Sequence, residues 1–343
     1  MSRRTSAPPR ATITDVAREA GVHPSTASRA LNPDTRGMVT EEVAARVGQV
    51  AERLGWRRSA LAAGLRTRRS RIVGILVPDL VNPIFPPILR AAEARLAAEG
   101  YATLVANTDN DLTREHMLVA RMAEHLVDGL MLASAAEGSE AVALCRRYAI
   151  PAVLVNRRLR GAGLSSVTND DVHGIALAVA HLVGLGHRRI AHLAGPPGIS
   201  TAADRRAGFR AALVRAGLDP RSAPIIAAEA YSREAGRLAC ARLLDAGGIT
   251  AIVAANDMLA LGVYEEAERR GIVVGRTLSV TGFNDMPFVD RMAPPLTTVR
   301  IQHAAMGAEA ASLLLSAMAA PDAPRRSLRL RAELVVRGST GPT

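Results

Sequence analysis

The stretch that most constrains the fold runs from Thr12 to Asn32, TITDVAREAGVHPSTASRALN, and predicts two short helices joined by a glycine turn. Thr12 is a suitable N-cap for the first helix, and the carboxylate of Asp15 can reach back to the cap amide. Gly21 can adopt the left-handed conformation that ends this helix. Pro24 suits the first turn of a second helix. Two such helices have the dimensions of a helix-turn-helix.

In a helix-turn-helix, the second helix lies in the DNA major groove with its N-terminal residues toward the base edges. Ser25, Thr26 and Ser28 are small hydrogen-bonding residues at these positions, and Arg29 is the one long donor. A guanidinium can bridge O6 and N7 of a guanine, whereas serine and threonine read bases less sharply or hold phosphates. The alternative is an ordinary helical hairpin in which Arg29 is a solvated surface charge.

The segment after these helices supports the DNA-binding interpretation. Thr40 can cap a third helix, Glu41 to Leu54, whose apolar positions fall on one face and complete a small core. Residues 57–66 then read RRSALAAGLR. Together with TDVAREAGV and STASRALN, this segment resembles the DNA-binding head and hinge of the LacI/GalR family of bacterial repressors. The resemblance continues over nearly the whole chain.

The resemblance implies roles for individual residues of the head. Base-contacting side chains of the family match Pro24, Ser25 and Arg29, and its phosphate-binding residues match Thr26, Ser28 and Asn32. A hinge leucine that the family wedges into the minor groove matches Leu65. Inserting an apolar side chain there unstacks a base step and bends the duplex.

Two features of the head depart from the family pattern. His23 replaces the serine that usually caps the second helix, and the turn from Asn32 to Val39 is longer than the common one. Both departures bear on the phosphate contacts expected of that turn.

The distribution of charge fits a head that binds a polyanion. The chain has a formal net charge of +11, and all 43 of its basic residues are arginine. Residues 1–70 hold thirteen arginines against six aspartate and glutamate residues, so most of the excess lies in a fifth of the chain. Such an asymmetry is typical of proteins that bind nucleic acid.

Cysteine usage and hydropathy favour a cytoplasmic protein without a metal. Cys145 and Cys240 lack C-x-x-C spacing, so we expect buried thiols in a reducing compartment rather than a zinc site. The N-terminal residues carry charge without an apolar core, which excludes a signal peptide. No apolar run reaches the length of a transmembrane helix. We expect no cofactor.

Beyond the basic linker at residues 66–71, strand-like and helix-like segments alternate, which predicts parallel sheets with helices on both faces. The expected fold is an all-α helix-turn-helix head plus an α/β core of two doubly wound parallel-sheet lobes, similar to periplasmic sugar-binding proteins. Leu328 to Val336 is expected to be one strand. The expected divisions are a disordered tail (1–10), the head (11–57), a hinge helix and linker (58–70), an N-terminal lobe (71–168 plus about 300–320) and a C-terminal lobe (169–299 plus about 326–338).

Two facing lobes create a cleft beyond the carboxyl ends of their strands, where open α/β sheets bind ligands. Polar amides, an arginine and aromatic rings in these loops suit a small hydroxylated molecule. The candidates are Asn82, Phe85, Asn156, Arg205, Tyr231, Asn256 and Asn284. The resemblance assigns the family's effector-gripping arginine to Arg205. Asn284 and Asn156 replace a carboxylate that is frequent in the family, which leaves room for a neutral or anionic effector.

Each cleft residue also has a structural interpretation. Asn256 or Asp257 could simply cap the helix that follows, and Arg205 could be a surface residue among neighbouring arginines. Ile301 stands where the family commonly has a glutamine.

Enzymatic motifs are missing from the sequence. It contains no G-x-x-x-x-G-K-[ST], H-E-x-x-H or G-x-S-x-G, and the prolines of GPPG at residues 195–198 stand where a phosphate loop needs amides. His181, His187 and His192 do not share a helical face as metal ligands would.

The sequence therefore predicts a homodimeric transcriptional repressor that binds a pseudo-palindromic operator and responds to a small effector such as a sugar, sugar acid or nucleoside. A transporter's sugar-binding protein is the main alternative, but it would need an export signal and no DNA-binding head. A non-specific nucleoid protein would fit the charge and leave the cleft without a purpose.

Overall fold

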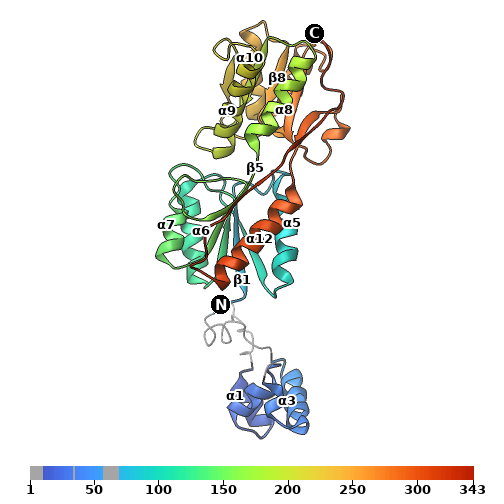
Figure 1. Cartoon of the computed structure of the whole chain (residues 1–343). Coiled ribbons are helices and arrows are strands. Elements are labelled where there is room, and N and C mark those ends of the chain that lie inside the picture. The colour runs from blue at the N-terminus through green and yellow to red at the C-terminus, as the bar shows by residue number, and fades with distance from the viewer. Residues whose placement is uncertain (1–10, 34, 57–68) are drawn as a thin grey trace, which may run out of the picture. The chain divides into compact units, whose positions relative to one another are not determined.

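The computed structural model describes residues 11–33, 35–56 and 69–343, which form two compact units, Met1–Ser70 and Arg71–Thr343. The predicted tail at residues 1–10 and residues 58–68 of the predicted hinge and linker, with Leu65, lie outside the described residues. Figure 1 shows the first unit as a small helical head. Its elements are α1 (Ile13–Glu19), α2 (Pro24–Ala30), the 3₁₀ helix η1 (Arg36–Met38) and α3 (Glu41–Arg53).

The head is organised by its helix ends and a small core. Thr12 and Asp15 form the expected capping box at α1, and Gly21 has a φ of 67° in the turn. Val16, Ala27 and Val47, one from each α-helix, are completely buried against one another. Thr40 occupies the N-cap position of α3 but its side chain makes no capping hydrogen bond. The small core fixes the angle between α1 and α2 that a helix-turn-helix requires.

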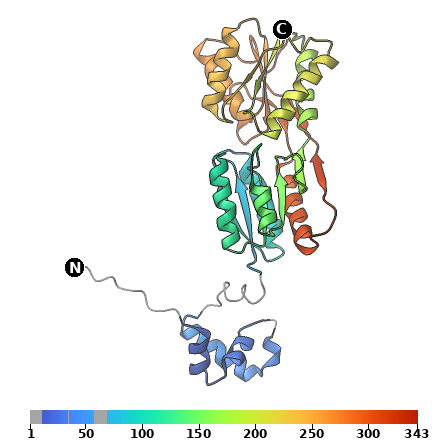
Figure 2. The ribbon, with the colours of Figure 1, turned by 90° about the vertical axis from the view of Figure 1, so that its left-hand side faces the viewer.

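The second unit contains two lobes, each a six-stranded sheet between helices (Figures 1 and 2). The first sheet has the order β11-β5-β4-β3-β1-β2, and every pairing in it is parallel. Helices α5 and α12 pack together on one face, and α6 and α7 on the other. The elements of this lobe are β1 (Ile72–Val77), α5 (Phe85–Ala97), β2 (Ala102–Asn107), α6 (Leu112–Glu124), β3 (Gly129–Leu132), α7 (Ala141–Arg147), β4 (Ala152–Val155), β5 (Ser165–Asn169), α12 (His303–Ala319) and β11 (Ser327–Leu330).

The second lobe repeats this plan with the strand order β12-β10-β9-β8-β6-β7, in which only β12 is antiparallel. Helices α8 and α9 cover one face, and α10 and α11 cover the other. Its elements are α8 (Asp171–Gly184), β6 (Ile190–Ala194), α9 (Ser200–Arg215), β7 (Ile225–Ala227), α10 (Arg233–Asp245), β8 (Ala251–Ala254), α11 (Asp257–Arg269), β9 (Ser279–Asn284), η2 (Val289–Arg291), β10 (Thr297–Arg300) and β12 (Glu333–Val335).

The chain crosses between the lobes three times: after β5, between β10 and α12, and between β11 and β12. The last crossing corrects two predictions, because residues 328–336 are not one strand and residues 326–338 do not all belong to the second lobe. Ser327–Leu330 pairs with β5 in the first sheet, and Glu333–Val335 pairs with β10 in the second. The alternation of charged and apolar residues continues through the crossing, so the pattern carries no sign of it.

Candidate functional site

Helix α2 presents its polar residues on the surface of the head. Ser25, Ser28 and Arg29 are exposed and Thr26 is partly exposed, whereas Ala27 and Ala30 turn into the core. Pro24, the first residue of the helix, is also partly exposed. The expected polar face of the second helix is therefore accessible, while Asn32 is only 6% exposed. Burial of Asn32 argues against the phosphate contact expected of it.

His23 caps α2 in place of a serine. Its Nδ1 accepts a hydrogen bond from the backbone N–H of Ser25 at 3.3 Å and lies 2.8 Å from the Ser25 hydroxyl. An imidazole can therefore replace a serine hydroxyl at this N-cap, provided that Nδ1 keeps its lone pair. The substitution leaves the helix start intact.

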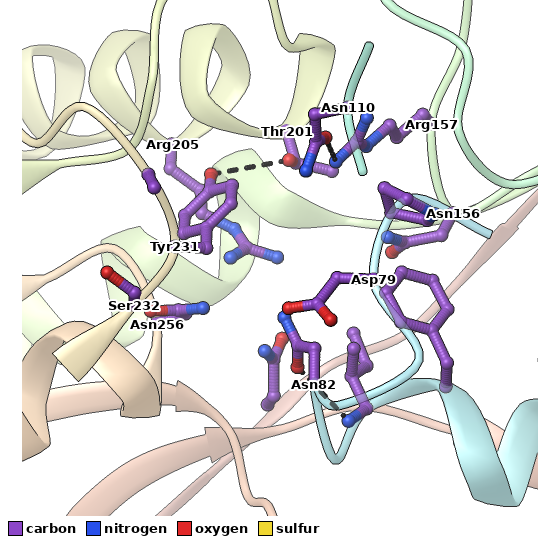
Figure 3. A pocket seen from close by; sticks show the side chains of 15 residues that line it. Asp79, Asn82, Asn110, Asn156, Arg157, Thr201, Arg205, Tyr231, Ser232 and Asn256 are labelled. Carbon is purple, nitrogen blue, oxygen red and sulfur yellow. Dashed lines mark hydrogen bonds between the residues drawn. The ribbon is translucent and has the colours of Figure 1, made fainter. Parts of the chain in front are cut away.

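A cavity of about 100 Å³ lies between the two lobes and is drawn in Figure 3. All seven residues predicted for the cleft line it: Asn82, Phe85, Asn156, Arg205, Tyr231, Asn256 and Asn284. They meet because the loops and the first turns of the helices that carry them follow the carboxyl ends of parallel strands, which share one edge of each sheet. The sequence reasoning missed Asp79, Asn110, Thr201 and Ser232, which also line the cavity.

Arg205 is fixed at the cavity wall by buried contacts. Its Nε donates to Asp171 Oδ1 at 2.8 Å, and its Nη1 donates to the carbonyl of Ala255 at 2.6 Å. The side chains of Arg205 and Asp171 are each 3% exposed. The surface interpretation of Arg205 is therefore wrong, and its charge is compensated by a carboxylate from the start of α8.

A second buried arginine, Arg157, has polar but uncharged partners. Its guanidinium donates to the carbonyl of Ser134 at 2.8 Å and to Asn110 Oδ1 at 2.9 Å. Burial lowers the pKa of Arg157 to about 10, which leaves it charged at neutral pH. In Figure 3 it lies beside Asn110 and Thr201, so both lobes meet at this side of the cavity.

Asparagine amides dominate the rest of the lining. Asn256 caps α11 through its Oδ1, which accepts a hydrogen bond from the N–H of Leu259 at 2.9 Å. The residue therefore both caps the helix and lines the cavity. Asn284 has a φ of 116°, and its Oδ1 is buried with no hydrogen-bond partner among the described residues. A buried acceptor without a partner costs free energy unless something bound in the cavity donates to it.

The described ranges contain neither a metal-binding cluster nor a membrane-spanning helix. No group of three or more histidine, cysteine, aspartate and glutamate side chains there has an arrangement that could hold a metal ion. None of the helices described is both long and apolar enough to span a bilayer.

Each of the two units matches a known protein family or domain. Residues 12–59 match the model of the bacterial regulatory proteins of the lacI family, and residues 179–340 match that of a periplasmic binding protein-like domain. The regulator DegA of Bacillus subtilis is 31% identical over 334 residues, covering 96% of this chain and 98% of DegA. The ribose operon repressor of the same organism is 34% identical over 306 residues, covering 89% and 91% of the two chains.

A solved structure of the Lac repressor dimer bound to operator and the anti-inducer ONPF has a TM-score of 0.82 to this chain. The two sequences are 26% identical, and the match covers 97% of this chain and 100% of the repressor chain. A helix-turn-helix head attached to a two-lobed ligand-binding core defines a ligand-responsive transcriptional regulator. The chain belongs to the lacI family of bacterial regulatory proteins, and it is a regulator rather than an enzyme.

Proposed function

We propose that the protein is a repressor that binds a pseudo-palindromic operator as a homodimer and is controlled by a sugar or related metabolite in the interlobe cavity. One observation carries the proposal: a head with an exposed polar recognition helix stands on the same chain as a cavity lined by both lobes. For the core, we propose the expected two-lobe division with residues 327–330 moved to the first lobe, because they pair with β5.

In the head, the proposed DNA contacts are the accessible residues of α2. Arg29 would read a guanine, Pro24 and Ser25 would meet base edges, and Thr26 and Ser28 would hold phosphates. Asn32 is left out because it is buried. The proposed wedge, Leu65, lies outside the described residues and rests on the family resemblance alone.

The effector site is proposed to comprise the seven predicted residues together with Asp79, Asn110, Arg157 and Thr201. Carboxamides both donate and accept, so they suit hydroxyl groups, and Phe85 and Tyr231 can cover an apolar ring face. The cavity volume, about 100 Å³, is about two-thirds of the roughly 150 Å³ of an apolar cavity that holds benzene, so the smallest candidate effector, a single sugar ring, is favoured. A relative named as a ribose operon repressor favours a sugar.

The proposed homodimer is supported by the edge strand β2. Leu104 and Val105 of this strand are 45% and 38% exposed. Only β1 pairs with β2, so its other edge has free backbone groups in the described structure. Exposed apolar residues on an open edge are typical of a surface that a second copy covers.

The proposal is tested by selecting duplexes from a random pool with the wild-type protein and measuring binding at fixed salt. A selected sequence should be a palindrome and bind at least about 10³-fold more tightly than random duplex. Arg29→Ala should cost about 1–3 kcal/mol on the selected duplex and much less on random DNA. Arg46→Ala, an exposed arginine of α3, is the control. A wild-type ratio near one would favour the nucleoid alternative.

A further inference from the structure

The first two turns of α9 carry two sets of side chains with different tasks. Thr201 and Arg205, four residues apart, line the cavity. Ser200 and Asp204 have the same spacing and contact the opposite lobe. Residues four apart lie on one side of a helix, so α9 has a cavity side and a neighbouring side that meets the first lobe.

The contact of Ser200 and Asp204 is with Arg158, in the loop after β4 of the first lobe. The backbone N–H of Arg158 donates to Ser200 Oγ at 3.0 Å, and its Nε donates to Asp204 Oδ2 at 3.1 Å. Its Nη2 donates to Asp204 Oδ1, which makes the pair bidentate. Nearby, the N–H of Glu137 donates to the carbonyl of Gly198 at 2.8 Å.

These contacts are adjacent to the cavity on both lobes. In the first lobe, Arg158 follows Arg157, whose guanidinium lines the cavity. In the second lobe, Asp204 precedes Arg205, which is fixed to Asp171. A change in the distance between Arg158 and Asp204 therefore moves two walls of the cavity relative to each other.

The contact between Arg158 and Asp204 has a moderate strength, which suits an equilibrium between an open and a closed cleft. The side chains of Arg158 and Asp204 are 38% and 24% exposed, so solvent screens part of their attraction. Bidentate geometry and the additional bond to Ser200 make the contact stronger than a typical surface pair. An ion pair within one lobe forms whatever the position of the other lobe, whereas the ion pair of Arg158 and Asp204 can form only when the two lobes approach each other.

We propose that Arg158, Ser200 and Asp204 form an interlobe latch that sets the fraction of effector-free molecules whose cleft is closed. The three are positioning residues, since they act through the cavity walls that they bring together. The consequence for DNA binding rests on the proposed function, together with the further proposal that closure of the cleft alters operator affinity. The latch itself is a property of the core and can be measured without DNA or effector.

The test measures distances between the lobes of the full chain without effector by double electron–electron resonance. Spin labels are placed at two exposed alanines, Ala143→Cys on α7 and Ala211→Cys on α9. Burial raises the pKa of the native thiols, Cys145 and Cys240, to about 12, so they react slowly with the label. Singly labelled proteins supply the distances between subunits.

Arg158→Ala should lower the ratio of closed to open molecules by about three- to tenfold, as expected for a partly exposed bidentate pair. Arg160→Ala is the matched control, because this exposed arginine has no ion pair within the described part of the chain. Combining Arg158→Asp with Asp204→Arg should restore much of the closed population.

Identical distance distributions for the wild type and Arg158→Ala would overturn the latch. It would also be overturned if the charge-swapped protein stayed as open as the single variant. Affinity for a duplex selected by the wild type is measured on the same variants. If the distances change as expected and this affinity does not, the latch stands and the proposed link between closure and operator binding fails.

Discussion

The guanidinium of Arg205 lies over the ring of Phe283, 3.8 Å from the ring centroid. Gly174 makes room for that ring, since a Cβ at this position would come within 2.7 Å of it. The aromatic face below, the carboxylate of Asp171 and the carbonyl of Ala255 together hold the guanidinium in one orientation. A donor fixed in this way before the ligand arrives loses little entropy on binding.

Arg205→Ala should lower the free energy of unfolding by about 3–5 kcal/mol, because it leaves the carboxylate of Asp171 buried without its partner. Urea unfolding followed by circular dichroism measures this loss. Adding Asp171→Asn should recover part of it, since the stranded charge is then gone. A single variant as stable as the wild type would contradict the buried ion pair, and the double variant separates stability from any loss of effector response.

Asn284→Ala should leave the unfolding free energy within about 1 kcal/mol of the wild type, because the Oδ1 atom that it removes has no partner in the described structure. The same variant should lose the response of operator binding to the effector. Thermal unfolding with and without ribose, as the first probe, measures stability and ligand binding, since a ligand that binds the native state raises the Tm. Operator binding with and without ribose measures the response. Asn256→Ala is the comparison, and it should cost about 1 kcal/mol because Asn256 also caps α11. A larger stability loss in Asn284→Ala than in Asn256→Ala would contradict the assignment.

Leu104→Glu should weaken the homodimer at least about tenfold, because a carboxylate replaces an exposed apolar side chain on the open edge of β2. Analytical ultracentrifugation over a range of concentrations gives the dissociation constant. Val214→Glu is the matched control, because Val214 is 61% exposed on α9, away from this edge strand. If both variants dimerise like the wild type, β2 is not the dimer surface.

The sequence predicted seven of the residues that line the cavity and missed others, such as Thr201 and Asn110. Most of the seven cleft residues could be found because they follow a recognisable strand, and parallel strands end at one edge. Arg205, within α9, was assigned through the family resemblance. Thr201 lies in the first turn of α9 and Asn110 three residues after β2, and neither was singled out, because which of these side chains enters the cavity depends on how the two lobes approach. The latch pair, Arg158 and Asp204, could not be predicted for the same reason. The two residues are 46 positions apart and come from different lobes.

The crossings between lobes were equally hard to predict, for a different reason. Residues 327–335 keep one alternating pattern while the chain leaves the first sheet and enters the second. Strand β5 was also missed, because its SSVTN sequence is polar although four of its five residues are buried. Local pattern reports the exposure of side chains and is blind to which sheet a strand joins.

Asp257 gives a prediction about pH. Its side chain is fully buried, accepts from the N–H of Met286 at 2.8 Å and from the hydroxyl of Thr298, and thereby ties α11 to the loop that follows Asn284. Burial, with a smaller contribution from nearby Asp285, raises the pKa of Asp257 to about 7, against which the two donors act only in part. In the unfolded chain the ordinary value of 3.8 applies.

Between these two pKa values the native carboxyl keeps a proton that the unfolded carboxyl has released. Raising the pH through this range therefore destabilises the native state, and the loss of stability levels off above about pH 7. Asp257→Asn cannot titrate and should escape the loss. The unfolding free energy of the wild type should therefore fall, relative to the variant, by more than about 1.4 kcal/mol between pH 5 and pH 8, the equivalent of one pKa unit. Thermal and urea unfolding at both pH values measure the difference. Comparing the two proteins at pH 5 controls for altered hydrogen bonds, because protonated aspartate and asparagine are nearly isosteric. Parallel pH profiles for the two proteins would refute the raised pKa of Asp257.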